Sequence, residues 1–462
     1  MSTLRLHDVE IDGRRRDVSV VDGVIASVGP RSTAPVSADH IVDGTGGALI
    51  PGLHDHHLHL LAMASAAGSV DCSPAAVSDL DGLAAALRSA PIEAEWIRGT
   101  GYHESVAGDL DRSLLDRVVP DRPIRIQHRG GALWMLNSAA LARVAAVLDE
   151  SSDVERDQAG TPTGRLWRYD ERLRRALPFT PPPVAAVGRR LAAYGVTGVT
   201  DATPDLDPTG LGLLVDAVRA GDLPQRLTLL GAPLGEALPF GIAVGPRKLH
   251  LRDHELPTFD ELLHAIASAH AVGRPVAIHC VTRTSLLLSL AALEQAGALA
   301  GDRIEHASVV PPEARAQLRA LGVRVVTQPD FLRTRGADYL RDVDADDVPL
   351  LYPYASLIEA GVPTCAASDA PYGSADPWQV IASVAARRTT AGIVIGEDER
   401  VDPATALAGY LSAPDDPAGP SRRVRAGAPA DLVLLDRSLT AALEQPSASH
   451  VRAVWIAGRQ VS

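Results

Sequence analysis

Short apolar segments that alternate with longer amphipathic ones dominate the second half of the chain. The longer segments have the period of a helix, as in Phe259–Val272, Thr284–Ala296 and Pro312–Leu321. Short buried strands that alternate with helices are typical of a parallel sheet. The apolar segments predict strands at Val196–Thr200, Arg226–Leu230, Lys248–Leu251, Val276–Cys280, Arg303–His306, Val323–Gln328 and Thr364–Asp369.

A further strand is predicted to begin at Leu53, because Pro51 and Gly52 interrupt the segment before it. Eight strands alternating with helices predict an α/β fold, a closed (β/α)8 barrel of the TIM type. The active site of such a barrel lies at the C-terminal ends of its strands. An open, doubly wound sheet is the alternative, which is disfavoured because no GxGxxG motif opens a helix in this chain.

The two ends of the chain have a different pattern from the middle. Short alternating segments with turn residues such as Asp22-Gly23 predict strands and hairpins there. We predict that residues 1–50 and 425–462 form one small discontinuous β-sandwich domain, with two unrelated edge hairpins as the alternative. Residues 51–424 are then expected to form the barrel.

An interval of about residues 61–195 interrupts the predicted barrel, because it has no short strand–helix rhythm. We expect an inserted α/β subdomain in this interval, covering the mouth of the barrel. Segments that follow barrel strands on the C-terminal side surround the active site of this fold.

The composition is that of an ordinary globular protein. The 462 residues are 46% hydrophobic and 22% charged, with a formal net charge of −13. Because nucleic acids and anionic membranes bind basic surfaces, this charge argues against both as partners. We expect a small-molecule substrate, and the sequence leaves a homo-oligomer open.

The lack of a recognisable signal peptide or membrane helix and the usage of cysteine both predict a cytoplasmic protein. No basic segment followed by an apolar run opens the sequence, and no stretch approaches the roughly 18 apolar residues of a membrane helix. The three cysteines, Cys72, Cys280 and Cys365, lack CxxC spacing. Sparse cysteines of this kind fit a reducing compartment and argue against a disulfide scaffold.

The strand that begins at Leu53 contains a cluster of histidines. On a strand, His57 and His59 lie on one face together with Asp55, while His54 and His56 lie on the other. Two imidazoles two residues apart at a strand end can hold one metal ion. Asp55 is placed to bind the ion or to support a ligand. A polar strand end with solvated histidines is the alternative.

Three other predicted strands also end in polar residues. His279, His306 and Asp369 each close an apolar segment, and Lys248 lies where a strand boundary is less clear. A lone histidine after apolar residues is usually a hydrogen-bonded core residue. Several such endings, all at predicted C-terminal strand ends, predict one shared metal site.

Several motifs together resemble the amidohydrolase superfamily and, within it, the amidohydrolase-3 (YtcJ-like) branch. The resemblance spans nearly the whole chain. Each motif is weak alone, but the set is specific. The motifs are Pro51–Leu60, Trp134–Leu141, Ile278-His279, Ile304–His306, Ser368–Pro371 and Gly427–Leu432.

The resemblance implies a divalent metal cofactor, namely two zinc ions. It also assigns a metal-binding role to particular residues of this chain. Lys248 would be carboxylated on its amine and would bridge the ions. An unmodified lysine cation could not lie between two dications, so the alternatives are a mononuclear site or a lysine that only packs at a strand boundary. The implied ligands are His57, His59 and Asp369 for the more buried ion, and His279 and His306 for the second.

The implied activity is hydrolysis of an amide or another C–N bond of a small molecule. Metal coordination lowers the pKa of water to about 7, which provides a hydroxide nucleophile. Asp369 would take its proton and pass it to the leaving nitrogen. A catalytically silent metal-binding or ligand-binding relative and a mononuclear deaminase-like enzyme are the alternatives. Thr282 stands where deaminases of the superfamily usually have a glutamate, which counts against deamination.

Candidate substrate-binding residues follow the barrel strands or lie in the insert. Arg283 and Arg333 follow strands, whereas His103 and Arg129 belong to the insert. Because arginine binds carboxylates through two parallel hydrogen bonds, these residues predict an anionic group on the substrate. Pairing of the arginines with surface aspartates such as Asp330 is the alternative.

Overall fold

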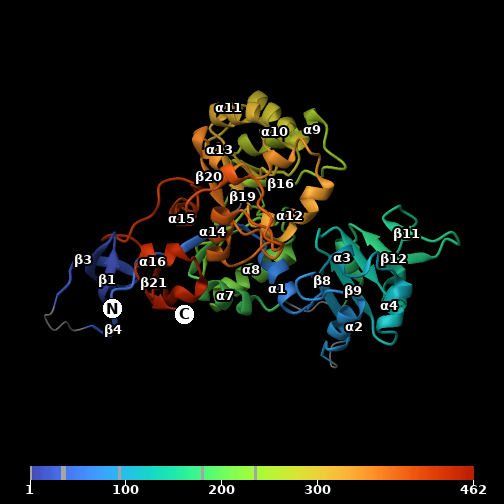
Figure 1. Cartoon of the computed structure of the whole chain (residues 1–462), viewed down its shortest axis with the longest axis horizontal. Coiled ribbons are helices and arrows are strands. Elements are labelled where there is room, and N and C mark those ends of the chain that lie inside the picture. The colour runs from blue at the N-terminus through green and yellow to red at the C-terminus, as the bar shows by residue number, and fades with distance from the viewer. Residues whose placement is uncertain (1–2, 33–37, 92–94, 178–181, 234–236) are drawn as a thin grey trace. The chain divides into compact units, whose positions relative to one another are not determined.

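The computed structural model divides the chain into two compact units, Met1–Leu60 with Val184–Ser462, and Leu61–Pro183. It describes residues 3–32, 38–91, 95–177, 182–233 and 237–462 (Figure 1).

Nine parallel strands organise the first unit, and they lie in two sheets. The first sheet holds β6 (Leu53–Leu58), β13 (Val196–Asp201) and β14 (Arg226–Leu229), with the short β15 (Ala243–Val244) at its edge. The second sheet holds, in spatial order, β16 (Arg247–Leu249), β17 (Val276–Cys280), β18 (Arg303–His306), β19 (Arg324–Thr327) and β20 (Thr364–Ala366).

Backbone hydrogen bonds join the two sheets at both edges. At one edge the Lys248 amide donates to the Leu230 carbonyl over 3.2 Å. At the other edge the amides of His59 and Asp369 each donate across the seam over 2.8 Å, to Ala370 and His57. The carboxyl ends of these parallel strands therefore face one region.

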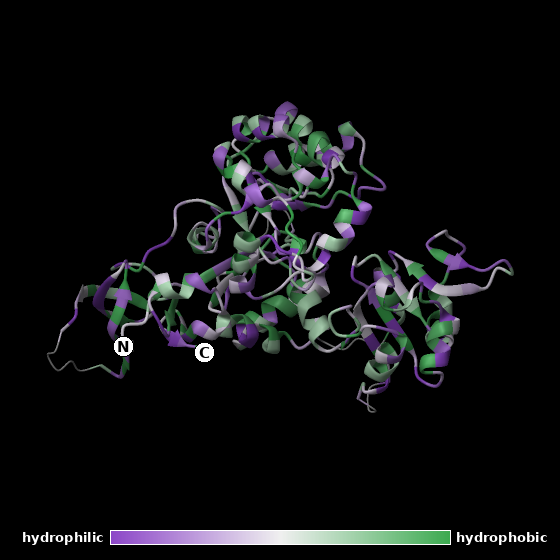
Figure 2. Ribbon diagram, viewed as in Figure 1, coloured by the Kyte–Doolittle hydropathy of each residue, from purple (hydrophilic) through white to green (hydrophobic). Residues whose placement is uncertain are grey.

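Helices cover the outer faces of these strands. The structure has α9 at Phe259–His270, α10 at Arg283–Ala296 and α11 at Pro312–Leu321, close to the predicted ranges. Helix α9 begins at a capping box in which Thr258 and Glu261 satisfy each other's backbone amides. Along α10 and α11, hydrophobic and hydrophilic residues alternate (Figure 2), because their apolar residues pack on the strands.

Further helices of the first unit connect the strands or pack beside them. None of the helices in the described ranges is long and apolar enough to cross a membrane. These helices are α1 (Leu60–Ala67, whose first residue belongs to this unit), α7 (Val184–Ala193), α8 (Pro208–Ala220), α12 (Phe331–Asp342), α13 (Tyr354–Glu359), α14 (Pro377–Ala386), α15 (Pro403–Leu411) and α16 (Leu439–Glu444).

Two four-stranded sheets are built from the ends of the chain and share one hydrophobic core. Leu6 and Val18 from the N-terminal sheet pack in it with Leu432 and Trp455 from the other. The first sheet runs β3 (Val24–Pro30), β2 (Arg14–Val21), β1 (Thr3–Ile11) and β4 (His40–Asp43). The second runs β23 (Arg459–Gln460), β22 (Val451–Ile456), β21 (Leu432–Leu435) and β5 (Leu49–Pro51).

The second unit is built around one six-stranded sheet with its own core, which includes Tyr102, Ile126 and Met135. The sheet order is β11 (Val154–Arg156), β12 (Pro162–Trp167), β10 (Leu133–Leu136), β9 (Ile124–His128), β8 (Ile97–Tyr102) and β7 (Val70–Asp71). Its helices are α2 (Leu80–Arg88), α3 (Glu104–Ala107), α4 (Arg112–Val118), α5 (Ser138–Val144) and α6 (Asp170–Ala176).

Most predicted strand ends agree with the structure within one or two residues, and the largest difference is at the last predicted strand. Thr364–Asp369 was predicted as a strand, but β20 ends at Ala366. Asp369 has a φ of 50°, in the left-handed region, so the backbone has already turned there. This turn aims the carboxylate at the strand ends instead of along the pleat of the sheet.

Candidate metal centre

Strand β6 presents its histidines to two different environments, as the period of a strand predicts. Nε2 of His54 lies 2.9 Å from the Thr200 hydroxyl, and Nε2 of His56 lies 2.9 Å from the Ser412 hydroxyl. These contacts give each of the two rings on one face of the strand a hydroxyl partner. His57 lies on the opposite face and is fully buried, together with Asp55.

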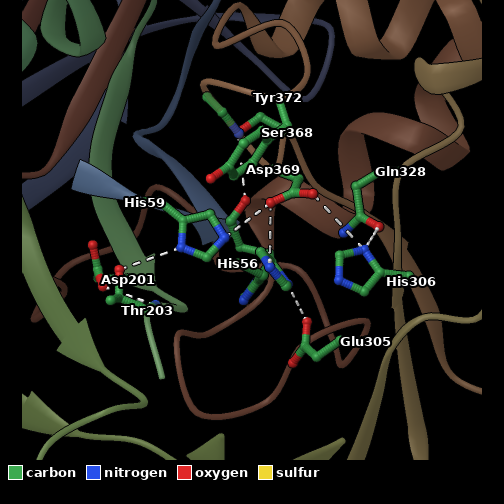
Figure 3. Close-up of polar contacts among 12 residues, drawn as sticks. His56, His59, Asp201, Thr203, Glu305, His306, Gln328, Ser368, Asp369 and Tyr372 are labelled. Carbon is green, nitrogen blue, oxygen red and sulfur yellow. Dashed lines mark hydrogen bonds and ion pairs between the residues drawn. The ribbon is translucent and has the colours of Figure 1, made fainter. Parts of the chain in front are cut away.

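The imidazoles of His57 and His59 both lie beside the Asp369 carboxylate, and Figure 3 shows that of His59 pointing at it. Oδ1 of Asp369 lies 3.0 Å from Nε2 of His59 and 3.5 Å from Nε2 of His57. Oδ2 lies 3.9 Å from Nδ1 of His306. His306, like Asp369, has a positive φ, of 70°. Non-glycine residues held in this region concentrate at functional sites, because the surrounding fold must compensate their strain.

The Nδ1 atoms of three of these rings contact oxygen atoms. Nδ1 of His57 contacts Oε2 of Glu305, Nδ1 of His306 lies 2.7 Å from Oε1 of Gln328, and Nδ1 of His59 lies 3.3 Å from the Thr203 hydroxyl. A neutral imidazole that donates from Nδ1 keeps its lone pair on Nε2. The network thus favours Nε2 as the ligand atom of these rings.

His279 and Lys248 complete the group. The ring of His279 lies 4.3 Å from that of His306 and 4.6 Å from that of His250, measured between centroids. Burial, followed by the charges of His306 and Lys248, lowers the pKa of His279 well below its ordinary value. Burial and Lys248 act in the same way on the pKa of His57. The structure therefore places His279 and Lys248 near His57, His306 and Asp369, whose ligand atoms lie within 4.8 Å of one another.

The Asp55 carboxylate binds backbone amides on both sides of the site. Its Oδ1 accepts hydrogen bonds from the amides of His57, over 3.1 Å, and Ser368, over 3.3 Å. Burial raises the pKa of Asp55 to about 6. These bonds fix the segment before Asp369 against strand β6.

Lys248 is the single lysine of the chain: of the 44 lysine and arginine residues, the other 43 are arginine. Its side chain is 3% exposed. Burial lowers the pKa of its amine, and the carboxylates of Glu305 and Asp369 oppose that shift. A lone amine at this position, in a chain that uses arginine at every other basic position, indicates chemistry that a guanidinium cannot perform.

Polar atoms left without partners test whether this site fits a metal ion. Within the described residues, Nε2 of His57, Nζ of Lys248 and Oδ1 of Asp369 are buried and have no hydrogen-bond partner. Ligand atoms of His57, His306 and Asp369 all lie within 4.8 Å of one another. Buried nitrogen and oxygen donors at this spacing fit a divalent cation, and their types suit zinc.

The arginines expected to bind substrate have partners within the chain. Nε of Arg283 lies 3.1 Å from Oδ1 of Asp347. Arg333 pairs with Asp330 through two hydrogen bonds of 2.7 and 3.2 Å. Both guanidinium groups thus pair with aspartates, which was the alternative to substrate binding.

The two candidates in the second unit lie at the ends of strands β8 and β9. The Arg129 amide donates to the Tyr102 carbonyl over 2.8 Å. Nε2 of His128 and Nε2 of His103 lie 3.1 and 3.7 Å from Oε2 of Glu104. In both histidines Nδ1 accepts a backbone amide. That tautomer carries its proton on Nε2, so the His128 ring donates to Glu104, whereas His103 lies too far from Oε2 for a hydrogen bond.

Three residues of the centre were not predicted as parts of it: Arg303, Glu305 and Gln328. Arg303 and Glu305 belong to a strand predicted to be buried, and a charged residue there is unusual unless it is paired or functional. That signal was present in the sequence. Gln328 carried no comparable signal, because a glutamine after an apolar strand fits an ordinary loop.

Comparisons with known proteins agree with the resemblance. An N-substituted formamide deformylase of Arthrobacter pascens is 27% identical over 490 residues, which cover 91% of this chain and 90% of that protein. The putative amidohydrolase YtcJ of Bacillus subtilis (strain 168) is 24% identical, over 83% of this chain and 82% of its own. The fold is similar to that of an uncharacterized metal-dependent hydrolase from Pyrococcus horikoshii OT3, with a TM-score of 0.75, 21% identity and coverage of 94% of this chain and 98% of the other. The pattern of the amidohydrolase family matches residues 40–462, and the chain therefore belongs to that family.

Proposed function

We propose that the chain is a metal-dependent hydrolase that cleaves an amide or a related C–N bond of a small molecule. The observation that carries this proposal is the convergence of buried polar atoms of His57, Lys248 and Asp369 at one place. Membership of the amidohydrolase family supports it. We take β6, β13, β14, β16, β17, β18, β19 and β20 to form a closed (β/α)8 barrel, in which the C-terminal strand ends are the place of catalysis.

The site would hold two zinc ions. His57, His59 and Asp369 would bind one ion, and His279 and His306 the other. Lys248, carboxylated on its amine, would bridge them. The buried position of Lys248 supports this assignment, because burial lowers the pKa of the amine and a neutral amine is the form that adds to carbon dioxide. An arginine stays protonated and could not replace it.

When bound, the ions would polarise the substrate carbonyl and supply water with a pKa near 7. Asp369 would accept the proton of the attacking water and donate it to the leaving nitrogen. Burial acts to raise the pKa of Asp369, but contact with His59 and the charges of His57 and Lys248 keep it below its ordinary value. The carboxylate is therefore an acceptor at neutral pH.

The main test measures metal content and turnover on the same preparation. Protein produced with zinc and bicarbonate is expected to hold two ions per chain and to hydrolyse members of an amide panel. N-substituted formamides come first in the panel because of the relative from Arthrobacter pascens. One ion per chain at most would contradict the dinuclear site. Full metal loading without turnover of any amide would favour a catalytically silent relative, and ammonia release from an aminated ring would favour a deaminase.

The bridging version has a separate test, because Lys248 is the single lysine. Protein labelled with carbon-13 only in lysine reports this one side chain by NMR. Addition of bicarbonate with zinc is expected to shift the signal of the carbon next to the amine. An unchanged signal at full metal occupancy would rule out carboxylation.

A further inference from the structure

The proposed chemistry leaves one pair of buried charges unexplained. Arg303 and Glu305 lie two residues apart on β18 and so on one face of the strand. Their side chains are 1% and 0% exposed, and Nε of Arg303 lies 2.5 Å from Oε1 of Glu305. Burying two charges costs several kcal/mol per ion, and an apolar pair of similar size is often as stable or more so. Stability alone therefore does not account for the pair.

Both members of the pair contact strand β6. Oε2 of Glu305 accepts from Nδ1 of His57. Nη2 of Arg303 donates to the carbonyl of His56 over 3.2 Å. The pair thus contacts both the ring of a candidate ligand and the backbone that carries it. Its opposite charges also cancel, so the acceptor adds no net charge beside the metal centre.

The Glu305 carboxylate differs in hydrogen-bonding capacity from the other two side chains that contact an imidazole Nδ1 in this centre. The Thr203 hydroxyl beside His59 can donate as well as accept. The Gln328 amide beside His306 can present either its oxygen or its NH2 group. An ionised carboxylate has no proton to donate, so Glu305 permits a single tautomer of His57. A charged acceptor also makes the ring a stronger ligand.

We propose that Arg303 and Glu305 are positioning residues that fix His57 with its proton on Nδ1 and so hold Nε2 ready for a metal ion. This inference rests on the proposed metal-dependent function. Nε2 of His57 fits that role, because it is buried without a hydrogen-bond partner and lies 3.5 Å from Asp369.

The test is zinc affinity, measured on metal-free protein by competition with a chromophoric chelator. Glu305→Gln is expected to weaken binding about 10–100-fold, the usual effect of losing such a partner. Glu305→Asp, which keeps the carboxylate, is expected to recover part of the affinity. The matched control is Glu399→Gln, since Glu399 is also buried but bonds to Ser356. It should bind zinc as the wild type does.

A second readout separates positioning from general damage. Cobalt bound in place of zinc should show an altered visible spectrum in Glu305→Gln and an unchanged one in the control. If Glu305→Gln fails to fold, the double variant Arg303→Met with Glu305→Met replaces it. That variant leaves no unpaired charge and should unfold at or above the wild-type temperature while still binding zinc weakly.

The outcomes distinguish this inference from the function on which it rests. Zinc binding within twofold of wild type, in either folded variant, would overturn the positioning role and leave the proposed function intact. A wild-type protein that binds neither zinc nor cobalt would overturn the proposed function itself.

Discussion

Replacing Lys248 with methionine should change the stability of the protein in opposite directions with and without metal. The Lys248 amine is buried and its nitrogen has no hydrogen-bond partner among the described residues. Such a group costs about 1–3 kcal/mol, and more when it is charged. Methionine is similar in length, adapts to irregular space and carries no charge. The metal-free variant should therefore be more stable than the wild type by about 1–3 kcal/mol.

The expected shifts can be measured by thermal unfolding. For a chain of 462 residues, 1 kcal/mol corresponds to about 1 °C in the midpoint. The metal-free Lys248→Met variant should thus unfold about 1–3 °C above the wild type, in buffer with a chelator and without bicarbonate. With zinc at ~1,000 times its Kd, the wild type should gain about 4 kcal/mol. The variant lacks the bridging group and should gain less, so the order reverses.

Tyr410→Phe is a suitable control, because the Tyr410 hydroxyl is also buried without a hydrogen-bond partner. Its effect on the midpoint should be the same with and without zinc. The reasoning fails if Lys248→Met is less stable than the wild type in the absence of metal. It fails equally if zinc raises the midpoints of both proteins by the same amount, because Lys248 would then contribute nothing to metal binding.

Three further variants test other contacts. Asp369→Asn should keep the fold but lower kcat/KM about 10²–10⁴-fold, since an amide cannot accept the proton; undiminished turnover at equal metal content would remove Asp369 from the mechanism. Arg283→Ala should affect an acidic substrate and its neutral amide equally, because Arg283 pairs with Asp347, and a selective loss on the acidic substrate would show charge recognition. Thr258→Ala removes the capping box with Glu261 and should lower the free energy of unfolding in urea by about 1 kcal/mol without changing turnover; an unchanged midpoint would contradict it.

The strand and helix pattern of the first unit was predictable because each element is encoded locally. Buried parallel strands such as Val276–Cys280 need continuous apolar residues, and helices such as Pro312–Leu321 need a periodic apolar face. The structure places β17 and α11 at these same residues. The strand ends were less predictable, because backbone turns such as that at Asp369 depend on contacts with distant segments.

The candidate metal ligands were easier to predict from the sequence than the residues that hold them in position. His57 and His59 lie close in sequence, so their spacing alone indicates a common ligand face. Glu305 contacts His57 across 248 positions of sequence, and no local pattern encodes that contact. Lys248 had a compositional signal that needs no structure, since it is the chain's single lysine. Rare residue types deserve the same scrutiny as motifs.

Arg333 shows why charge near a strand end is weak evidence for substrate binding. Asp330 lies three residues before it, within reach across one turn of α12. The Asp330 carboxylate also accepts a hydrogen bond from the hydroxyl of Ser383. Asp330 already makes two hydrogen bonds to the Arg333 guanidinium. A substrate carboxylate would have to displace Asp330 to bind there.

The buried charges around the candidate metal centre make sense only as a set. Glu305 and Asp369 carry negative charge, Arg303 is positive, and Lys248 adds an amine that burial disfavours as a cation. Any one of them alone would be costly, because an unpaired charge in a protein interior is expensive. The neutral imidazoles between them supply lone pairs and no compensating charge. A bound divalent cation would balance the charge of the carboxylates and would bind the imidazole lone pairs at the same time. Metal binding would therefore offset the cost of burying these groups at the strand ends.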